Sequence, residues 1–248
     1  MTELNTIKYE TDSTEYLKSL PDNFFDLVIL DPPGNKLVRD DWDNQWKTED
    51  DYIEWLVNIL KECSRVLKSS GSLYCFQWIG EKNPLTLAKF LMEVNKNKDL
   101  YFKDMVTWQK QRGFGNKRGW LYTREELFWY VKDNKKFIWN KEHQYSDVKR
   151  LFTITGSKNK SEYKRHTNIW NITEVGFGTC PKNFSKERNK NGKHSTPKPK
   201  EIFERIINVH TKENDNILIP FSGTGIVEDV CRHLGRNFLG VELNKRER

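Results

Sequence analysis

Segments typical of strands and helices alternate along this chain on both sides of one irregular stretch. Residues 25–30 form a short apolar run that ends at two prolines and a glycine, which predicts a buried strand entering a loop. A helix is predicted next, over 49–67, because Thr48 and Asp51 form a capping-box-like start before a one-sided apolar pattern. Further strands are predicted at 72–78, 102–108, 216–219 and 237–243, and further helices at 84–94, 199–210 and 225–234.

This alternation predicts an α/β fold with a Rossmann-like, doubly wound, mostly parallel sheet, because parallel strands need helical crossovers that cover the sheet faces. The stretch 141–193 interrupts the alternation, since it shows little periodicity and many Lys, Asn, Ser and Gly residues. Weaker strand-like patterns at 126–131 and 136–139 precede it. We therefore expect one half of a domain at 1–140, an inserted region at 141–193, and the second half of the same domain at 194–248.

Positive charge is concentrated in the insert. Residues 141–193 contain 12 Lys and Arg against 5 Asp and Glu, which equals the +7 net charge of the whole chain. Clustered cations neutralise phosphates, so the insert is interpreted as a polyanion-binding element, with a solvated Lys-rich loop as the alternative. The cations assigned to DNA binding in this interpretation are Lys149, Arg150, Lys158, Lys160, Lys164, Arg165, Lys186 and Arg188.

Composition excludes several other classes. The 9 Trp, 9 Tyr and 14 Phe exclude a chain that is disordered throughout. No apolar run reaches the roughly 18 to 20 residues that cross a bilayer, and the N-terminus does not resemble a signal peptide, so a cytoplasmic protein is expected. The four Cys have no CxxC spacing and the five His have no HxxxH or HExxH spacing, which predicts reduced thiols and no metal.

A glycine turn is the first candidate site. Residues 221–225 read FSGTG and lie between a predicted strand and a predicted helix, where glycine lets the backbone approach a ligand and the helix offers unpaired N–H groups. Glu242 ends the next predicted strand, 17 residues beyond Gly225, where a carboxylate can bind two ribose hydroxyls. A tight strand-to-helix turn without a nucleotide is the alternative.

Two further sites adjoin predicted strand and helix ends. Asp31-Pro32-Pro33-Gly34 follows a buried strand, and its prolines fix the backbone so that the Asp31 carboxylate and the Pro32 carbonyl could accept hydrogens from a planar amino group. A loop capped by an Asx-turn is the alternative. The segment 193–199 holds Thr196 and Lys198, which could meet a carboxylate, although a basic loop before a proline-started helix has the same pattern.

The order of these motifs resembles the β-class DNA amino-methyltransferases, a class I methyltransferase family that uses S-adenosylmethionine. Members have a circularly permuted order in which DPP-aromatic comes first, a target-recognition region follows, and FxGxG comes last. Here Asp31-Pro32-Pro33 precedes the basic insert, and the segments 194–199 and 221–225 follow it. The resemblance also covers Thr11-Asp12-Ser13, so it spans nearly the whole chain.

The resemblance implies transfer of a methyl group from S-adenosylmethionine to the exocyclic amino group of a DNA base that is flipped out of the duplex. Asp31, Pro32, Pro33 and Gly34 would form the catalytic motif, without a metal. Within the implied cofactor site, Asp12 and Ser13 would contact adenine, Glu242 the ribose, and Thr196 and Lys198 the methionine carboxylate. The full set that the resemblance assigns to the cofactor is Asp12, Ser13, Asp31, Thr196, Lys198, Phe221, Ser222, Gly223, Gly225 and Glu242.

Two positions depart from the family pattern. Gly34 stands where members carry an aromatic ring that stacks on the flipped base, and Ile219 stands where many members have Asp. Loss of the ring would remove about 1 to 3 kcal/mol of stacking. The aromatic residues that could compensate are Trp42, Trp46, Phe114 and Trp120.

The Asp-first motif favours adenine N6 as the acceptor in a bacterial restriction-modification or phage-like enzyme. Cytosine N4, an RNA base, and a catalytically impaired subunit that only binds nucleic acid remain open, the last because of Gly34. The sequence does not decide between a monomer, a homodimer and a complex with a partner subunit.

Overall fold

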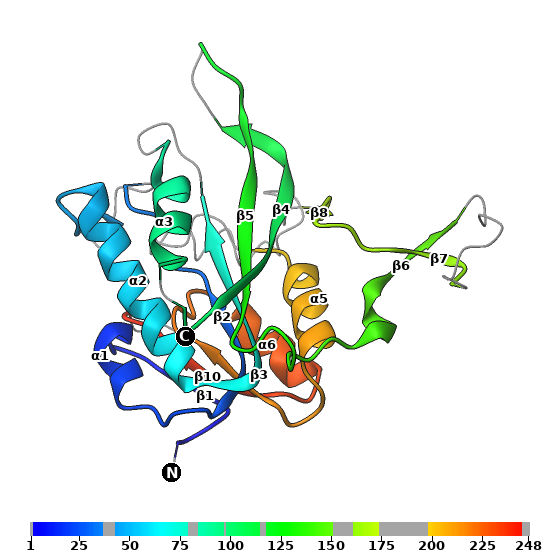
Figure 1. Cartoon of the computed structure of the whole chain (residues 1–248), viewed down its shortest axis with the longest axis horizontal. Helices are drawn as coiled ribbons and strands as arrows, with labels where there is room; N and C mark the ends of the chain where they lie inside the picture. The colour runs from blue at the N-terminus through cyan, green and yellow to red at the C-terminus, as the bar shows by residue number, and fades with distance from the viewer. Residues whose placement is uncertain are drawn as a thin grey trace, which may run out of the picture.

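The computed structural model describes residues 2–36, 43–78, 84–96, 98–114, 118–150, 161–173 and 198–244. Their main feature is an eight-stranded sheet with the strand order β1-β10-β9-β2-β3-β5-β4-β8 (Figure 1). Neighbouring strands are parallel except that β5 runs antiparallel to both β3 and β4. The strands of this sheet are β1 (Thr6–Lys8), β2 (Phe25–Leu30), β3 (Leu67–Gln77), β4 (Tyr101–Phe114), β5 (Tyr122–Val131), β8 (Ile169–Trp170), β9 (Asn216–Ile219) and β10 (Asn237–Val241).

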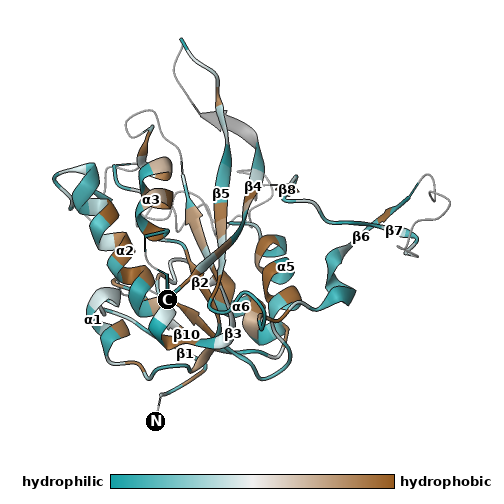
Figure 2. Cartoon of the chain, viewed as in Figure 1, coloured by the Kyte–Doolittle hydropathy of each residue, from teal (hydrophilic) through white to brown (hydrophobic). Residues whose placement is uncertain are grey.

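Helices cover both faces of the sheet, which gives the molecule two separate apolar cores. Alternate residues of β2 enter different cores: Val28 and Leu30 pack towards α2, whereas Leu27 and Ile29 pack towards α5 and α6. The apolar sides of these helices turn towards the sheet in Figure 2. One face is covered by α1 (Ser13–Lys18), α2 (Glu49–Val66) and α3 (Thr86–Val94), and the other by α5 (Lys200–His210) and α6 (Ile226–His233).

The doubly wound, mostly parallel sheet expected from the alternation is confirmed, and most predicted elements are present with small shifts of their ends. Gly71 stands between the predicted helix at 49–67 and the predicted strand at 72–78, where a glycine indicates the end of an element, but it lies inside β3. A Cβ at Gly71 would approach Leu67 Cδ1 to 2.6 Å and the Asp26 carbonyl oxygen to 3.0 Å. Glycine at this position therefore allows close packing rather than ending an element.

Other elements escaped the prediction because their patterns are short or local. The three-residue β1 and the six-residue α1 are too short for a clear period, and residues 136–139 form a turn and irregular chain instead of a strand. The predicted strand at 102–108 extends as β4 to Phe114, so that β4 and β5 form a long hairpin beyond the body of the sheet (Figure 1).

Within the insert, β6 (Tyr145–Lys149) and β7 (Tyr163–Arg165) pair antiparallel and form an arm that projects from the body, next to the short 3-10 helix η2 (Lys141–Gln144) (Figure 1). The chain then returns to the sheet, where Trp170 of β8 lies opposite Trp108 of β4. Part of the expected insert therefore completes an edge of the main sheet, and the division into 1–140, 141–193 and 194–248 stays a prediction.

Expectations from composition can be compared with the described residues. Cys63, Cys75 and Cys231 are buried free thiols. Among the helices that the structure describes, none combines the length and the apolar character needed to cross a membrane. In the same parts of the chain, no group of three His, Cys, Asp or Glu side chains could hold a metal ion.

The topology creates a switch point between β2 and β9. These strands are adjacent and parallel, with Leu27 opposite Ile217. The crossover from β2 to β3 uses α2 on one face, whereas the crossover from β9 to β10 uses α6 on the other face. In open α/β sheets a ligand crevice forms where the connections diverge in this way, at the carboxyl ends of the strands. The loops after β2 and β9 occupy that position.

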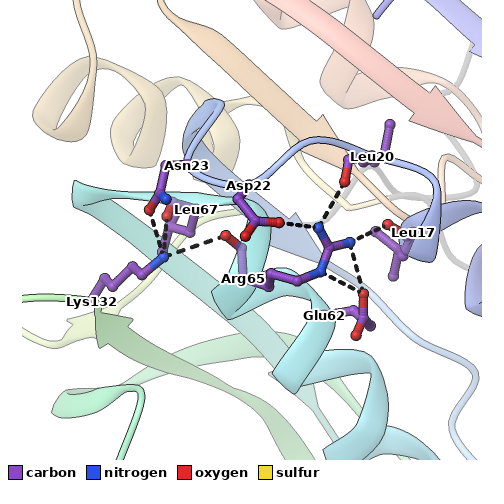
Figure 3. Close-up of polar contacts among 8 residues, drawn as sticks. All are labelled: Leu17, Leu20, Asp22, Asn23, Glu62, Arg65, Leu67 and Lys132. Atoms are coloured by element: carbon purple, nitrogen blue, oxygen red, sulfur yellow. Dashed lines mark hydrogen bonds and ion pairs between the residues drawn. The ribbon is translucent and has the colours of Figure 1, made fainter.

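A hydrogen-bond cluster at the opposite end of the sheet ties α1, α2 and the start of β2 together (Figure 3). The Arg65 guanidinium donates to the carbonyls of Leu17 at 2.8 Å and Leu20 at 2.7 Å, and it pairs with Asp22 and Glu62. Lys132 donates to the Leu67 carbonyl at 2.7 Å and to Asn23 at 2.9 Å. Arg65 thus adds charge-assisted hydrogen bonds to carbonyls at the end of α1 and just beyond it.

Replacing Arg65 with Met is expected to lower the free energy of unfolding by about 2 to 3 kcal/mol, because several charge-assisted hydrogen bonds are lost together. Urea denaturation followed by circular dichroism measures this change. The matched control is Lys18→Met, which removes an exposed pair with Glu15 and should leave the urea midpoint unchanged. Equal midpoints for both variants would show that the Arg65 cluster adds no stability.

Candidate active site

Three predicted motifs lie level with one another at the carboxyl end of the sheet. Asp31 is the first residue after β2, Phe221 is the second after β9, and Glu242 is the first after β10. The pairings Leu27 to Ile217 and Ile219 to Gly240 fix this common height. The residues singled out from separate parts of the sequence are therefore brought together at the switch point.

The Asp31 loop is held by contacts from two directions. Both Asp31 carboxylate oxygens accept hydrogen bonds from Lys198 Nζ, at 2.8 and 3.0 Å. The buried Tyr52 hydroxyl donates to the Pro33 carbonyl at 2.8 Å, and Tyr52 packs edge-on against Trp46 with ring centroids 4.9 Å apart. Burial raises the pKa of Tyr52, so its hydroxyl stays a donor. The loop after β2 is thus fixed in one orientation.

The glycine turn and Glu242 form one hydrogen-bonded unit. Gly223 and Gly225 have φ of 53° and 75°, a left-handed conformation that glycine adopts without strain, and Gly225 caps α6. The Gly223 N–H donates to Glu242 Oε2 at 2.8 Å, and the Asn244 N–H donates to Oε1 at 3.0 Å. Oε1 also accepts a longer hydrogen bond from Asn244 Nδ2, at 3.4 Å, so Oε2 is the carboxylate oxygen that keeps a lone pair for a further hydrogen bond.

Asp12 and Ser13 lie beside this turn, but their side chains make internal bonds. Asp12 caps α1, because its Oδ1 accepts from the N–H groups of Thr14 at 2.8 Å and Glu15 at 3.2 Å. The buried Ser13 hydroxyl donates to the Pro220 carbonyl. These bonds attach the start of α1 to the loop after β9, and the adenine contact suggested for both residues stays a prediction.

Lys198 contacts a residue that the sequence did not single out. Its ammonium lies 2.8 Å from Asp31 and 3.4 Å from the buried carboxylate of Glu125 in β5. Burial alone would lower the pKa of Lys198, but the two carboxylates outweigh burial and raise it. Sequence reasoning missed Glu125 because one acidic residue in a strand pattern has no motif. The signal that could have found it is the charged pair Glu125-Glu126 at the start of an otherwise apolar strand.

The structure describes only some of the remaining predicted residues. Of the four aromatic residues considered as substitutes for the ring missing at Gly34, Trp46 is buried against Tyr52 and Trp55, and Trp120 is 95% exposed at the tip of the β4–β5 hairpin. The side chain of Phe114 and the whole of Trp42 lie outside the description. The same holds for Thr196, Lys158, Lys160, Lys186 and Arg188.

Four cations assigned to DNA binding lie on the described part of the arm. Lys149 and Arg150 are at the end of β6, and Lys164 and Arg165 belong to β7, all three residues of which are exposed. Lys149 approaches Glu162 at 3.8 Å, and Arg150 Nε donates to the Tyr163 carbonyl at 3.2 Å. The arm therefore presents cations to solvent outside the body of the protein, as Figure 1 shows for its two strands.

Comparison with known proteins agrees with this fold and motif arrangement. The model of the N6/N4 DNA methylase family matches residues 25–248. The type II methyltransferase M.HpaI of Haemophilus parainfluenzae is 31% identical over 241 residues, which cover 95% of this chain and 69% of that protein.

Two solved structures share the fold. The PvuII DNA methyltransferase, described as cytosine-N4-specific, aligns with a TM-score of 0.76 at 16% identity and covers 99% of this chain and 83% of its own. The M1.HpyAVI–SAM complex aligns with a TM-score of 0.56 at 22% identity and covers 97% and 94%.

The chain belongs to the N6/N4 DNA methylase family, which confirms the resemblance seen in the order of its motifs. It is a DNA methyltransferase of this family, whose name covers N6 and N4 methylation.

One unusual residue adjoins the glycine turn. Glu228 in the first turn of α6 is fully buried, and a Cβ at Gly240 of β10 would collide with its carboxyl group and with the Ser222 hydroxyl. Burial raises the pKa of Glu228 to about 7, although Ser222 and Arg232 act in the opposite direction. Between the usual pKa near 4.5 and about 7, the unfolded chain loses this proton while the folded protein keeps it. Glu228 therefore makes the protein less stable as pH rises through this window.

Replacing Glu228 with Gln is expected to remove this loss, because the amide cannot ionise. Between pH 5 and pH 8, the free energy of unfolding of the unmodified protein should therefore fall by about 2 to 3 kcal/mol more than that of the Glu228→Gln protein. Thermal or urea unfolding at both pH values measures it. The control is the exposed neighbour, Asp229→Asn, which should reproduce the original pH dependence; a Glu228→Gln protein with that same dependence would contradict the assignment.

Proposed function

We propose that this chain transfers a methyl group from S-adenosylmethionine to the exocyclic amino group of a DNA base, with adenine N6 as the acceptor. The observation that supports this most directly is the common height of Asp31, Phe221 and Glu242 at the switch point of the sheet. An acceptor for amino hydrogens and a nucleotide-type carboxylate then lie at the same end of the sheet. Membership of the DNA methylase family agrees with that arrangement.

The residues around the glycine turn fit S-adenosylmethionine. Glu242 is held by two backbone N–H groups and would accept hydrogen bonds from the ribose hydroxyls, while Gly223 and Gly225 have no side chains that would keep a ligand from the backbone of the turn. Phe221 packs on Trp55 with centroids 5.8 Å apart and borders the same turn. The bound cofactor supplies a methyl group on a positively charged sulfur. Lys198 is the cation that the described part of this site offers to the methionine carboxylate.

The Asp31 loop performs the step on the base. An exocyclic amine shares its lone pair with the ring, so it is a weak nucleophile. Hydrogen bonds from its two N–H groups to the Asp31 carboxylate and the Pro32 carbonyl would favour the lone pair on nitrogen and aim it at the methyl group. Positioning and electrostatic stabilisation supply most of the rate increase in such a site. Tyr52 keeps the loop rigid through Pro33.

Adenine is preferred because the catalytic motif begins with Asp, the form that the family resemblance associates with N6 acceptors. Cytosine N4 is the rival acceptor, and the specific observation in its favour is the fold similarity to a cytosine-N4-specific enzyme. A chain that binds DNA and cofactor without transfer is the other rival, because Gly34 supplies no ring to stack on a flipped base. A role in bacterial restriction-modification is part of the proposal, through similarity to a type II methyltransferase.

The test is incubation with S-adenosylmethionine carrying a labelled methyl group and unmethylated DNA, followed by nucleoside analysis. We expect N6-methyladenine; N4-methylcytosine would support the first rival, and binding without transfer the second.

Asp31→Asn should lower transfer about 10²- to 10³-fold with cofactor affinity nearly unchanged. Glu242→Gln should instead weaken cofactor binding in calorimetry by about 10- to 100-fold, because charge-assisted hydrogen bonds are lost. The opposite pattern would reverse the two assignments.

The arm is proposed to bind the DNA backbone. The double variant Lys164→Ala/Arg165→Ala should weaken DNA binding on all sequences and reduce the slope of log K against log salt by up to about 2, since each phosphate contact contributes about 0.9 for duplex DNA. Fluorescence anisotropy at several salt concentrations measures both quantities. Lys18→Ala/Lys61→Ala removes the same charge from α1 and α2 and should leave the slope as it was. Equal slopes for the two double variants would show that the arm is a solvated loop that does not bind the DNA backbone.

A further inference from the structure

Four charged side chains of alternating sign form a continuous row at the carboxyl end of the sheet. Asp31 pairs with Lys198, Lys198 approaches Glu125 at 3.4 Å, and Glu125 accepts a hydrogen bond from Lys110 of β4. Their formal charges cancel. Only the first two of these residues were suggested by sequence motifs, so Glu125 and Lys110 have no role in the function proposed above.

The pleat of the sheet explains why these residues meet. Along β2, Leu27 and Ile29 face α5, so Asp31 two residues later points to the same side. Along β5, Leu127 faces α5, and Glu125 lies on the same side of the strand. Along β4, Trp108 faces this side too, and Lys110 shares it. Lys198 enters from the chain segment that leads into α5. The meeting is therefore fixed by strand register rather than by flexible surface side chains.

The pair at the closed end of the row is deeply buried. Lys110 and Glu125 are each 4% exposed. The Lys110 ammonium lies 3.8 Å from the centre of the Trp78 ring, which adds a cation–π contact on one side. Burial alone would raise the pKa of Glu125, but Lys198 and Lys110 outweigh burial and lower it, so the carboxylate is ionised.

A buried ion pair of this kind is poorly explained by stability alone. Taking both charges out of water costs free energy that their attraction often does no more than offset, and an apolar pair of the same volume is commonly as stable. A buried pair can instead be explained by function when its contacts extend to the group that acts on the substrate. Glu125 contacts the ammonium that contacts both oxygens of Asp31.

We propose that Glu125, held in place by Lys110, is a positioning residue that fixes the Lys198 ammonium and, through it, the Asp31 carboxylate. Glu125 gives Lys198 a second anionic partner on the sheet. The position of the ammonium is therefore fixed by two carboxylates instead of by Asp31 alone. Asp31 then keeps the orientation in which it can accept an amino hydrogen of the base. This inference rests on the proposed role of Asp31 in methyl transfer.

The decisive variant is Lys110→Met/Glu125→Gln, which removes both charges with little change in volume. Because both members of the buried pair are made neutral together, its unfolding midpoint should stay close to that of the unmodified protein. Its turnover on unmethylated plasmid DNA at saturating cofactor should nevertheless fall about 10- to 100-fold, as expected for a catalytic group displaced by about 1 Å. The Kd of S-adenosylhomocysteine in calorimetry should rise by less than turnover falls, because Lys198 keeps its charge for the methionine carboxylate.

The matched control is Lys68→Met/Asp26→Asn. This pair likewise joins two neighbouring strands, β2 and β3 instead of β4 and β5, with 2.8 Å between Lys68 Nζ and Asp26 Oδ2, but it lies at the opposite end of the sheet. Its removal should leave turnover within about twofold. An equal fall in both double variants would overturn the positioning role, and so would unchanged turnover in the Lys110→Met/Glu125→Gln protein.

A second pair of variants does not depend on the double substitution. Glu125→Asp keeps the charge and should retain most of the turnover that Glu125→Gln loses, when both are assayed below their unfolding temperatures. Equal turnover of the two would count against the proposal. The unmodified protein and Asp31→Asn are measured in parallel: no transfer by the former, or full transfer by the latter, rejects the proposed function itself rather than the role of Glu125.

Discussion

The adjacency of β2 and β9 is the constraint on which the site depends. Two parallel strands lie side by side while their crossovers leave on opposite faces, so neither crossover helix closes the space above their carboxyl ends. The chain reaches this point twice, once through Asp31 and once through Phe221. Asp31 and Phe221 are therefore close although most of the sequence separates them. The pairing of the two backbones places them at the same level of the sheet, independently of side-chain contacts.

The register of the strands was the part of the structure that the sequence revealed least. Apolar runs and turn residues predicted the buried strand before Asp31, the capped helix that begins after Thr48 and the helix after Gly225, because these signals are local. Gly71 misled the same reasoning, since a glycine that permits close packing looks like one that ends an element. Short elements such as β8 have no usable period and exist only because β4 offers an edge.

The same distinction applies to the site. Asp31, Gly223 and Glu242 could be singled out because each stands in a short motif at a predicted strand end. Glu125 was not, because its role depends on which strands are neighbours and on which face of the pleat it lies. The pairing of Lys198 with Asp31 was not visible in the sequence either, and the contact of Lys198 with the methionine carboxylate stays a prediction.

Charge is distributed so that binding and chemistry are separated. The excess of cations belongs to residues 141–193, and the described part of that segment includes an exposed arm. The row from Asp31 to Lys110 is neutral as a whole and largely buried. A neutral row exerts little long-range pull on phosphates, whereas clustered exposed cations do. In the proposed function, attraction to the DNA backbone therefore resides in the arm, while the loop after β2 would receive an uncharged base amino group whose recognition depends on short-range hydrogen bonds.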